Sequence, residues 1–556
     1  MILTEEQKQI LSTKTDMVIE ARAGTGKTTT LIEFSLQEEK DKKLYLAFNK
    51  SISEEAKVKF ADRKVKNISI STAHGLAYKS IIIGKQYKLG YNLSTYHLAK
   101  HLKTTGTQAA NKIVTHSIRK FDIFCNSAVD SVDDIVYKDY IDLERSSKFY
   151  SEHRSSVDKY AKQIWDDMVS KKLDCTHSFY LKLYQLSKPV LNQDIIMLDE
   201  AQDANPVILD IFFNQKCRKV MVGDNHQAIY SWRGAINALK LAPENWSKLQ
   251  LTESFRFPQE IADLGLEVLS FKEGKEESFD FSKLRLIGKG TSTKIETKAI
   301  ISRSNIALLE KMIVSKNLYR KPFVEGGLDS LLQTNSGVSL TDIFYLKRGE
   351  KDKIQNFFVK NFKTLDELLD YYEDVDDQSI NSFCNFIKKF ENSLLVELDA
   401  LKKRLSDSKE YADYIFSTIH KAKGNEWDEV TILSPDNFED GFPIKVPNAI
   451  TQKGRDGKVI NIELTDEEKE IKRKQWIEEL NIYYVAVTRA KVKLSHSIEW
   501  LGESVDNTNL QSEDISDDDN KIVSIKWITK DGKELSASNE DEFFEHLKMT
   551  YPERFK

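Results

Sequence analysis

Two kinds of apolar pattern alternate along the chain. Short unbroken runs such as MVIE at 17–20 and DIIMLD at 194–199 predict strands that are buried on both faces. Longer segments such as LDELLDYYEDV at 365–375 repeat apolar residues every three or four positions, which predicts amphipathic helices. Helical patterns also dominate residues 81–189. Buried strands that alternate with helices predict an α/β fold built on parallel sheets.

The length and composition describe a globular protein of several domains. The 556 residues exceed what one hydrophobic core holds, and they predict about three or four compact units. Hydrophobic residues make up 40% and charged residues 30%, as in ordinary folded proteins. No apolar run approaches the ~20 residues that span a bilayer. The N-terminus lacks the basic and apolar stretches of a signal peptide, so we expect a cytoplasmic protein with no membrane partner.

Cysteine and charge patterns exclude several classes of site. The four cysteines lie far apart, without a CxxC pair, which argues against structural zinc and iron–sulfur clusters. We interpret them as buried or incidental thiols. The net charge of −5 neither favours nor excludes nucleic acid, because a local basic groove can lie within an acidic total.

A phosphate-binding loop follows the first strand. The segment ARAGTGKTTT at 21–30 is bounded by that strand and by the apolar helical start LIEFSL. Gly24 and Gly26 let the backbone aim N–H groups at phosphate oxygens, and the helix N-terminus adds partial positive charge. Lys27 is expected to reach the β- and γ-phosphates, and the Thr28 hydroxyl to bind Mg²⁺. The segment therefore predicts ATP and Mg²⁺ as cofactors.

An acidic pair follows the buried run at 194–198. Ligands bind at the carboxyl ends of parallel strands in open α/β sheets, so this pair and the phosphate loop are expected to converge on one edge. Asp199 is predicted to hold Mg²⁺, directly or through water. Glu200 is predicted to act as the base that orients and activates the attacking water.

Further motifs follow in a fixed order. They are LTEEQKQIL at 3–11, LAFNKSISEEA at 46–56, ISTAHGLAY at 70–78, VGDNHQAIYSWRGA at 222–235, LTESFRFP at 251–258, STIHKAKGNEWDEVTIL at 417–433 and EELNIYYVAVTRAK at 478–491. Together with the two motifs above, they resemble those of superfamily 1 DNA helicases of the UvrD/Rep/PcrA type, over about residues 1–500. The strings SFYLKLYQLSKP, HKAKG and YVAVTRAK resemble most the motor of the F-box DNA helicases. No F-box precedes the first motif, so we do not expect ubiquitin-ligase assembly.

The resemblance implies roles for individual residues in ATP hydrolysis. Gln7 corresponds to the residue that reads adenine, Phe255 to an aromatic that stacks on it, and Glu426 to a ribose contact. Gln227 corresponds to the γ-phosphate sensor, and Arg256 and Arg489 to two arginine fingers. The implied catalytic set is Lys27, Glu200, Gln227, Arg256 and Arg489. The implied ATP-binding set is Gln7, Ala23, Gly24, Thr25, Gly26, Lys27, Thr28, Thr29, Phe255 and Glu426, and Thr29 departs from the arginine that many relatives carry there.

The same resemblance implies a contact surface for single-stranded DNA. Bases stack on aromatic side chains with little regard to sequence, and hydroxyl and basic groups bind the backbone. The residues in motifs that make such contacts are Phe48, Asn49, Thr72, His74, Tyr230, Trp232, Arg233, Thr418, His420 and Lys421. The alternation of Tyr230 and Trp232 predicts an extended segment with both rings on one side. Ordinary core packing is the alternative for either ring.

The resemblance also predicts two RecA-like parallel-sheet motor domains with inserted, mainly helical accessory domains. The first motor domain is predicted at 1–80 and 190–254, and the second at 255–327 and 410–510. Residues 81–189 are predicted to form the first accessory domain and 328–409 a short second one. Residues 511–556 are expected to form an acidic linker and a small appendage. Phe438 and Phe442 are either strand-separating wedge residues or ordinary packing residues.

We therefore predict an ATP-dependent DNA helicase that moves 3′→5′ on single-stranded DNA, with ATP hydrolysed in the inter-domain cleft. The expected partners are single-stranded and forked DNA, with a protein partner left open and a monomer or weak oligomer as the active form. One alternative is a translocase that displaces proteins or drives a partner nuclease with little unwinding of its own. A more distant alternative is a nucleotide-gated switch that holds DNA without moving. Repair, recombination control, replication and phage defence are all compatible with the sequence.

Overall fold

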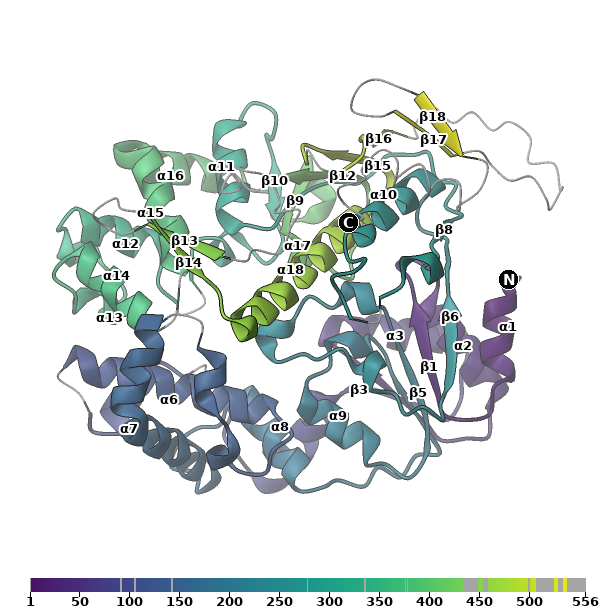
Figure 1. Cartoon of the computed structure of the whole chain (residues 1–556), viewed down its shortest axis with the longest axis horizontal. Coiled ribbons are helices and arrows are strands. Elements are labelled where there is room, and N and C mark those ends of the chain that lie inside the picture. Colours follow the sequence, from purple (N-terminus) through teal and green to yellow (C-terminus); the bar gives the residue numbers. More distant parts are fainter. Residues whose placement is uncertain are drawn as a thin grey trace. The chain divides into compact units, whose positions relative to one another are not determined.

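A computed structural model describes most of the chain (Figure 1). The described residues are 2–90, 93–104, 107–141, 144–277, 279–334, 337–375, 377, 379–433, 449–453, 459–498, 501–506, 525–528 and 534–537. Phe438, Phe442 and the acidic run at 511–520 lie outside these ranges. The chain divides into two compact units: unit 1 is Met1–Thr252 with Ala299–Gly424, and unit 2 is Glu253–Lys298 with Asn425–Lys556. In the described residues no helix is long and apolar enough to cross a membrane.

Unit 1 contains a six-stranded sheet in the order β3-β2-β4-β5-β1-β6, in which all neighbouring strands are parallel. The expected strands at 17–20 and 194–198 are confirmed, and the second of them lies in the interior of the sheet. The strands are β1 (Met17–Ala21), β2 (Lys43–Ala47), β3 (Ile68–Thr72), β4 (Ile195–Leu198), β5 (Arg218–Gly223) and β6 (Ser247–Leu251).

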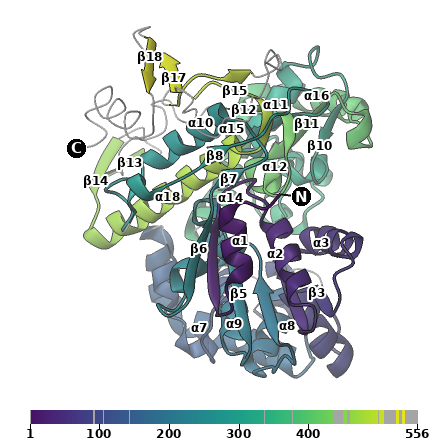
Figure 2. The ribbon, with the colours of Figure 1, turned by 90° about the vertical axis from the view of Figure 1, so that its right-hand side faces the viewer.

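Both faces of this sheet are covered. Met17 and Ile19 pack into the apolar cluster on one face, and Val18 packs into the cluster on the other. This two-residue period explains why the strands are apolar without interruption. Figure 2 shows α1 and α2 side by side against the sheet. The nearby helices are α1 (Glu5–Ser12), α2 (Lys27–Gln37), α3 (Lys50–Asp62) and α9 (Pro206–Phe213).

A helical segment lies between β3 and β4 in the sequence, as the pattern at 81–189 predicts. Its helices α6 and α7 pack along each other (Figure 1). Phe121 and Phe124 of α6 and Ile164 of α7 are buried in one shared core. The helices are α4 (Ala73–Ala77), a π-helical turn at Tyr78–Ile83, α5 (Thr95–His101), α6 (Gln108–Asn126), α7 (Glu144–Val169) and α8 (His177–Leu186).

The second part of unit 1 contains three parallel strands in the order β10-β11-β9. Helices lie between these strands in the sequence and after the last of them. The strands are β9 (Lys298–Ser302), β10 (Pro322–Val324) and β11 (Tyr414–Thr418). The helices are α11 (Asn305–Val314), α12 (Leu340–Lys347), α13 (Phe357–Lys360), α14 (Leu365–Asp374), α15 (Ser379–Phe390), α16 (Leu394–Arg404) and α17 (Ile419–Ala422). The amphipathic helix expected at 365–375 is α14. It packs on α6 and α7, where its Asp374 pairs with Lys112 and Arg145.

In unit 2, β12 (Trp427–Leu433) runs parallel to β15 (Ala490–His496), and β16 (Val505–Asp506) pairs antiparallel with β15. Helix α10 (Gln259–Ser270) packs against α18 (Asp466–Val487). In the part of unit 2 that the structure describes, the remaining strands form three small pairs: β7 (Glu253–Ser254) with β8 (Ile287–Gly288), β13 (Ala449–Lys453) with β14 (Val459–Glu463), and β17 (Ile525–Ile528) with β18 (Glu534–Ala537). The α/β class predicted from the sequence is confirmed.

Candidate nucleotide site and nucleic-acid groove

The glycine-rich loop joins β1 to α2 in unit 1. Gly24 and Gly26 have φ angles of 74° and 76°, in the left-handed region that side chains disfavour. Helix α2 begins at Lys27, and no side chain caps its N-terminus. The first N–H groups of the helix are therefore available to an anion, and the helix dipole favours negative charge there.

The acidic pair lies at the carboxyl end of β4, beside this loop. The ammonium of Lys27 is 2.7 Å from Glu200 Oε1. Burial disfavours the charged form of Glu200, but Lys27 outweighs it, with help from Lys423, and lowers the pKa of Glu200 to about 2. Burial, and then the charge of Glu200, raise the pKa of Asp199 to about 6. Burial opposes the charge on Lys27 as well, but the surrounding carboxylates outweigh it and raise its pKa.

Tyr45 is a residue of this site that the sequence analysis missed. Its side chain is fully buried on β2, and its hydroxyl donates a hydrogen bond to Asp199 Oδ2. The same hydroxyl also interacts with the Thr28 side chain. It therefore connects the two residues expected to hold Mg²⁺. One hydroxyl and one carboxylate beside an open helix N-terminus fit this ion, which takes few protein oxygens and completes its shell with phosphates and water.

Gln7 lies against the start of α2. Its Nε2 donates to Thr30 Oγ1 at 3.1 Å, and its Oε1 accepts from the Thr4 N–H at 3.0 Å. The amide keeps a second N–H and a second lone pair for a ligand. A Cβ on Gly26 would lie 3.7 Å from Nε2, in ordinary van der Waals contact, so Gln7 lies directly against the loop. The structure thus places Gln7 at the loop.

A buried chain of polar contacts leads from the loop to Gln227. The Arg22 guanidinium lies 2.8 Å from Glu20 Oε1 and 3.6 Å from Asp224 Oδ1. The other oxygen of Asp224 accepts a hydrogen bond from Gln227 Nε2 at 2.7 Å. Arg22, Asp224 and Gln227 are all buried. The amide of the predicted phosphate sensor is therefore oriented by a carboxylate, which an arginine of the loop approaches in turn.

Lys423 is a second residue that the sequence analysis missed. Its ammonium forms an ion pair with Asp203 and donates to the carbonyl oxygen of Gln227. It also lies 5.2 Å from the centre of the Tyr230 ring. One cation thus contacts the acidic motif, the sensor segment and an aromatic residue of the groove. The HKAKG string contains two lysines, Lys421 and Lys423. The sequence does not distinguish them, because they differ only in the residues that each contacts in the fold.

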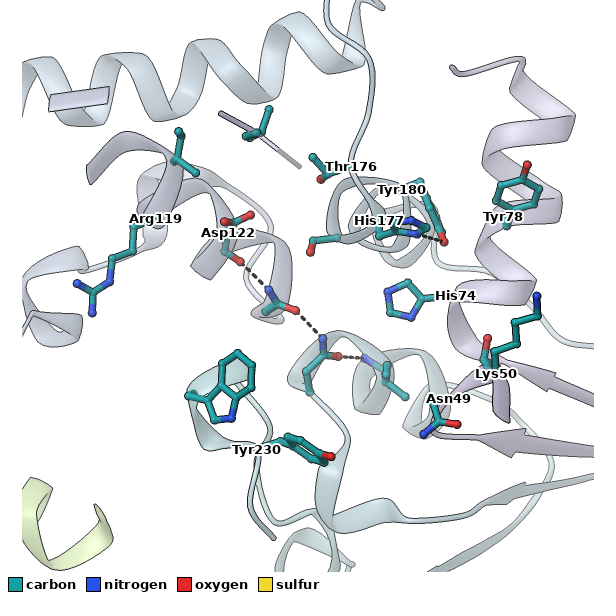
Figure 3. Close-up of a pocket in the computed structure, with 18 of the residues that line it drawn as sticks. Asn49, Lys50, His74, Tyr78, Arg119, Asp122, Thr176, His177, Tyr180 and Tyr230 are labelled. Carbon is teal, nitrogen blue, oxygen red and sulfur yellow. Dashed lines mark hydrogen bonds between the residues drawn. The ribbon is translucent and has the colours of Figure 1, made fainter. Parts of the chain in front are cut away.

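A large groove, about 1800 Å³ in volume, lies in unit 1 beside this aromatic residue (Figure 3). In Figure 3, His74, His177 and Tyr180 gather on one side, and Arg119 and Asp122 lie on another. Burial, and then the neighbouring His177, lower the pKa of His74 to about 4, so this ring is neutral at pH 7. Aromatic and basic residues of the wall include Phe48, Lys50, Tyr78, Lys79, Tyr230 and Trp232.

Several predicted DNA-contacting residues meet in this groove. The rings of Phe48 and Tyr230 stack with centroids 5.5 Å apart. Trp232 is 59% exposed on the same wall. The expected extended segment is wrong: Ser231–Arg233 is a 3₁₀ turn, which Gly234 ends at φ 75°. Both aromatic rings nevertheless line one cavity.

Other residues of the predicted set have structural contacts. Asn49 and Thr72 line the groove and also cap helices, through bonds to Ile52 N and Gly75 N. Thr418, His420 and Lys421 do not belong to the described wall of the groove. Thr418 caps α17, the His420 carbonyl accepts from the Tyr230 hydroxyl, and Lys421 donates to Ser330 Oγ at 2.6 Å. Arg233 is the last residue of the 3₁₀ turn.

The predicted residues of unit 2 lie near the ends of its strands. Arg256 pairs with Glu426 at 2.6 Å and donates to the carbonyl of Thr488 at 3.0 Å. Arg489 is buried and donates to the carbonyls of Asn425 and Val485. Phe255 is half exposed, as an aromatic available for stacking must be. Arg256, Glu426 and Arg489 thus form one local cluster.

The loop and the acidic pair define unit 1 as a P-loop nucleotide-binding fold. Residues 3–245 match the UvrD/REP helicase N-terminal domain, and residues 298–499 match the UvrD-like helicase C-terminal domain. The chain belongs to the UvrD/Rep family of helicases.

Individual relatives are similar to this chain over about half to nine tenths of its length. F-box DNA helicase 1 of Gallus gallus is 32% identical over 537 residues, which cover 90% of this chain and 49% of the relative. F-box DNA helicase protein 1 of Schizosaccharomyces pombe is 29% identical over 88% of this chain and 57% of its own length. A probable DNA helicase II homolog of Mycoplasma genitalium is 25% identical over 48% of this chain and 42% of its own. The chain thus spans about half the length of the curated relatives it matches.

Proposed function

We propose that this chain is a DNA-stimulated, Mg²⁺-dependent ATPase that moves 3′→5′ along single-stranded DNA and separates duplexes ahead of it. The position of Lys423 carries the proposal. Its contacts with Asp203, Gln227 and Tyr230 connect the acidic motif of the nucleotide site to the aromatic wall of the groove. A motor needs such a connection, because nucleotide state must change the grip on DNA. The names of the relatives and the family support DNA as the substrate.

The proposed chemistry starts from the Lys27–Glu200 ion pair. In this pair Glu200 is a weak base, because the ammonium stabilises its charged form. When Lys27 moves to the phosphates of ATP, the pKa of Glu200 is expected to rise, and the carboxylate becomes able to accept a proton from the attacking water. Thr28 and Asp199 would hold Mg²⁺, which when bound neutralises charge on the phosphates. Gln227, oriented through Asp224, would sense the γ-phosphate.

The remaining roles come from the family resemblance. Arg256 and Arg489 are proposed as arginine fingers, which stabilise charge on the transferred phosphoryl group and are typically worth about 10³–10⁵ in rate. Phe255 is proposed to stack on adenine and Glu426 to contact ribose. Using Arg256 as a finger requires it to exchange its present bond to Glu426 for the nucleotide.

The groove is proposed as the path of the single strand. Base stacking on aromatic residues is worth about 1–3 kcal/mol per base and tolerates any sequence. The Phe48–Tyr230 stack and the exposed Trp232 supply such faces, and Lys50 and Lys79 supply charge for the backbone. A neutral His74 can stack without repelling nearby cations.

ATPase rates with and without single-stranded DNA test the motor proposal directly. A rate that does not respond to DNA would reject it. Unwinding of 3′-tailed and 5′-tailed duplexes then tests polarity, and only the 3′-tailed duplex should be opened. Displacement of a protein block on single-stranded DNA, measured beside forked-duplex unwinding, separates a helicase from a translocase that unwinds poorly.

A further inference from the structure

A second cavity of about 420 Å³ lies in unit 1, with no residue in common with the large groove. It lies between two segments that are distant in the sequence. Arg320 and Lys321 precede β10 on one side. Lys403 and Arg404 end α16 on the other, followed by Asp407 and the exposed Tyr411. The volume suits a ligand of about the size of a nucleotide.

The two segments are held in place by hydrogen bonds. Asp413 Oδ2 accepts the backbone N–H groups of Arg320 and Lys321 at 2.6 and 3.0 Å. The Ser406 N–H donates to the Pro322 carbonyl at 2.9 Å and ties the segment after α16 to the start of β10. The basic side chains therefore project from a defined backbone. The carboxylate of Asp413 accepts hydrogen bonds from backbone N–H groups. It therefore does not neutralise the basic side chains of the pocket, which can bind a ligand.

The charge of the lining is strongly positive. The lining contains one carboxylate, Asp407, and four basic residues: Arg320, Lys321, Lys403 and Arg404. Lys403 pairs with Asp399 one helical turn earlier, but both side chains are exposed, and a phosphate can compete for such a pair. The guanidinium of Arg404 is fixed by the carbonyls of Met312 and Tyr319, while its Nε is buried without a hydrogen-bond partner among the described atoms.

Tyr411 narrows the class of anion. Its side chain is 75% exposed, although a tyrosine ring gains free energy when it is covered. An inorganic phosphate needs no aromatic face. Sites for single-stranded nucleic acid combine basic side chains with an exposed aromatic ring. The basic side chains bind the phosphate backbone, and an unpaired base stacks on the ring.

We propose that this pocket binds a second segment of single-stranded nucleic acid, apart from the strand in the large groove. The phosphates contact Arg320, Lys321 and Lys403, and one base stacks on Tyr411. The proposal goes beyond the motor function, because translocation along one strand needs only the groove. A DNA substrate with two single-stranded arms binds at both sites. One arm lies in the large groove, and the other lies in the pocket.

Fluorescence anisotropy of labelled DNA tests this. Two duplexes are compared without nucleotide, one with a 3′ oligo(dT) tail and one with both 3′ and 5′ oligo(dT) tails. We expect the wild-type chain to bind the two-tailed duplex about tenfold more tightly, from one stacked base and its phosphates. The Tyr411→Ala variant and the Arg320→Glu/Lys321→Glu double variant should lose that preference and keep their affinity for the single-tailed duplex. The double variant should also reduce the salt dependence of two-tailed binding by about 0.7 in log–log slope for each phosphate that it no longer binds.

The matched control is Lys402→Glu, which reverses an exposed charge on the same helix outside the pocket lining. It should leave the preference intact. The proposal is wrong if the wild type shows no preference, if both pocket variants retain it, or if Lys402→Glu abolishes it equally. It is also wrong if thymidine monophosphate, added as competitor, binds the pocket as strongly as the tail does. ATPase stimulation by a short oligo(dT) in the same variants should be unchanged, and its absence from the wild type would reject the motor function instead.

Discussion

Lys423 and Asp203 form an ion pair in which the Asp203 side chain has no exposed surface. Burial raises the pKa of Asp203 to about 6, although Lys423 acts in the opposite direction. The Asp203 carboxylate is therefore charged at pH 7. The attraction of Lys423 offsets the free energy that its burial costs. The pair lies between the nucleotide site and the groove, so its loss should affect both stability and coupling.

We expect Lys423→Ala to lower the free energy of unfolding by about 3–5 kcal/mol, because it leaves a buried carboxylate without its counter-charge. The Asp203→Asn/Lys423→Met double variant should recover most of this loss, since neither group is then charged. Urea unfolding followed by fluorescence measures the stability. If the double variant is no more stable than Lys423→Ala, the ion pair is not the cause. In the double variant, DNA should stimulate ATP hydrolysis less than in the wild type.

Lys27→Ala should abolish ATP turnover while single-strand binding stays within a few-fold of the wild type. The reason is that Lys27 contacts the acidic pair at the nucleotide site and does not line the groove. Turnover is measured by phosphate release and binding by anisotropy of labelled oligo(dT). Normal turnover in this variant would contradict the assignment of the phosphate loop.

Trp232→Ala should weaken the stimulation of ATPase by DNA and leave basal hydrolysis nearly unchanged. Removing one stacking face is expected to weaken DNA binding by about 1–3 kcal/mol. The apparent affinity for oligo(dT) in the ATPase assay reports this. The matched control is Tyr140→Ala, which removes an exposed aromatic ring outside the groove. Equal effects of the two variants would count against a specific platform.

Tyr45→Phe removes only the hydroxyl that connects Thr28 to Asp199. Loss of an outer-shell partner typically lowers metal affinity about 10–100-fold. We expect the Mg²⁺ concentration for half-maximal nucleotide affinity to rise by that factor, with a smaller change in the maximal rate. Tyr184→Phe, which alters a buried tyrosine of the helical segment, is the control. An unchanged Mg²⁺ requirement in Tyr45→Phe would show that the hydroxyl serves packing alone.

Acid should destabilise unit 1 through His74. Its folded pKa of about 4 lies below the usual value of 6.5, so the unfolded chain binds more protons between these values. The contribution of neutral His74 to the free energy of unfolding is complete above about pH 6.5 and is lost as the pH falls toward 4. His74→Gln should remove about 1–2 kcal/mol of the stability difference between pH 7 and pH 5. Urea midpoints at the two pH values measure it, and His97→Gln, at an exposed position, should leave the difference as it is in the wild type.

The local parts of the fold and of the site could be predicted from the sequence. The strand at 17–21, the turn at Gly24 and Gly26 and the position of Asp199 depend on neighbouring residues and on the edge rule for parallel sheets. These signals are short in sequence, and they were sufficient to predict the P-loop and its acidic pair.

The parts that could not be predicted depend on contacts between distant residues. Tyr45 is one apolar-strand residue among several, and only the pairing of β2 with β4 brings its hydroxyl to Asp199. Lys423 reaches Asp203 from 220 positions away in the sequence. The segment around Trp232 was expected to be extended because alternation is a strand signal, but Gly234 permits a tight turn that the alternation does not show.

The order of strands in the first sheet has a consequence for synthesis of the chain. Met17 of β1 pairs with Val220 of β5 and with Ser247 of β6, so both neighbours of this strand lie roughly 200 residues downstream. At about 5–20 residues per second, a ribosome needs roughly 10–40 s to supply them. During that time the apolar faces of β1 and α2 have no sheet to join. We expect nascent chains that stop before β5 to bind chaperones and aggregate, whereas chains that extend past Gly424, where unit 1 ends, should hold unit 1 in a protease-resistant form.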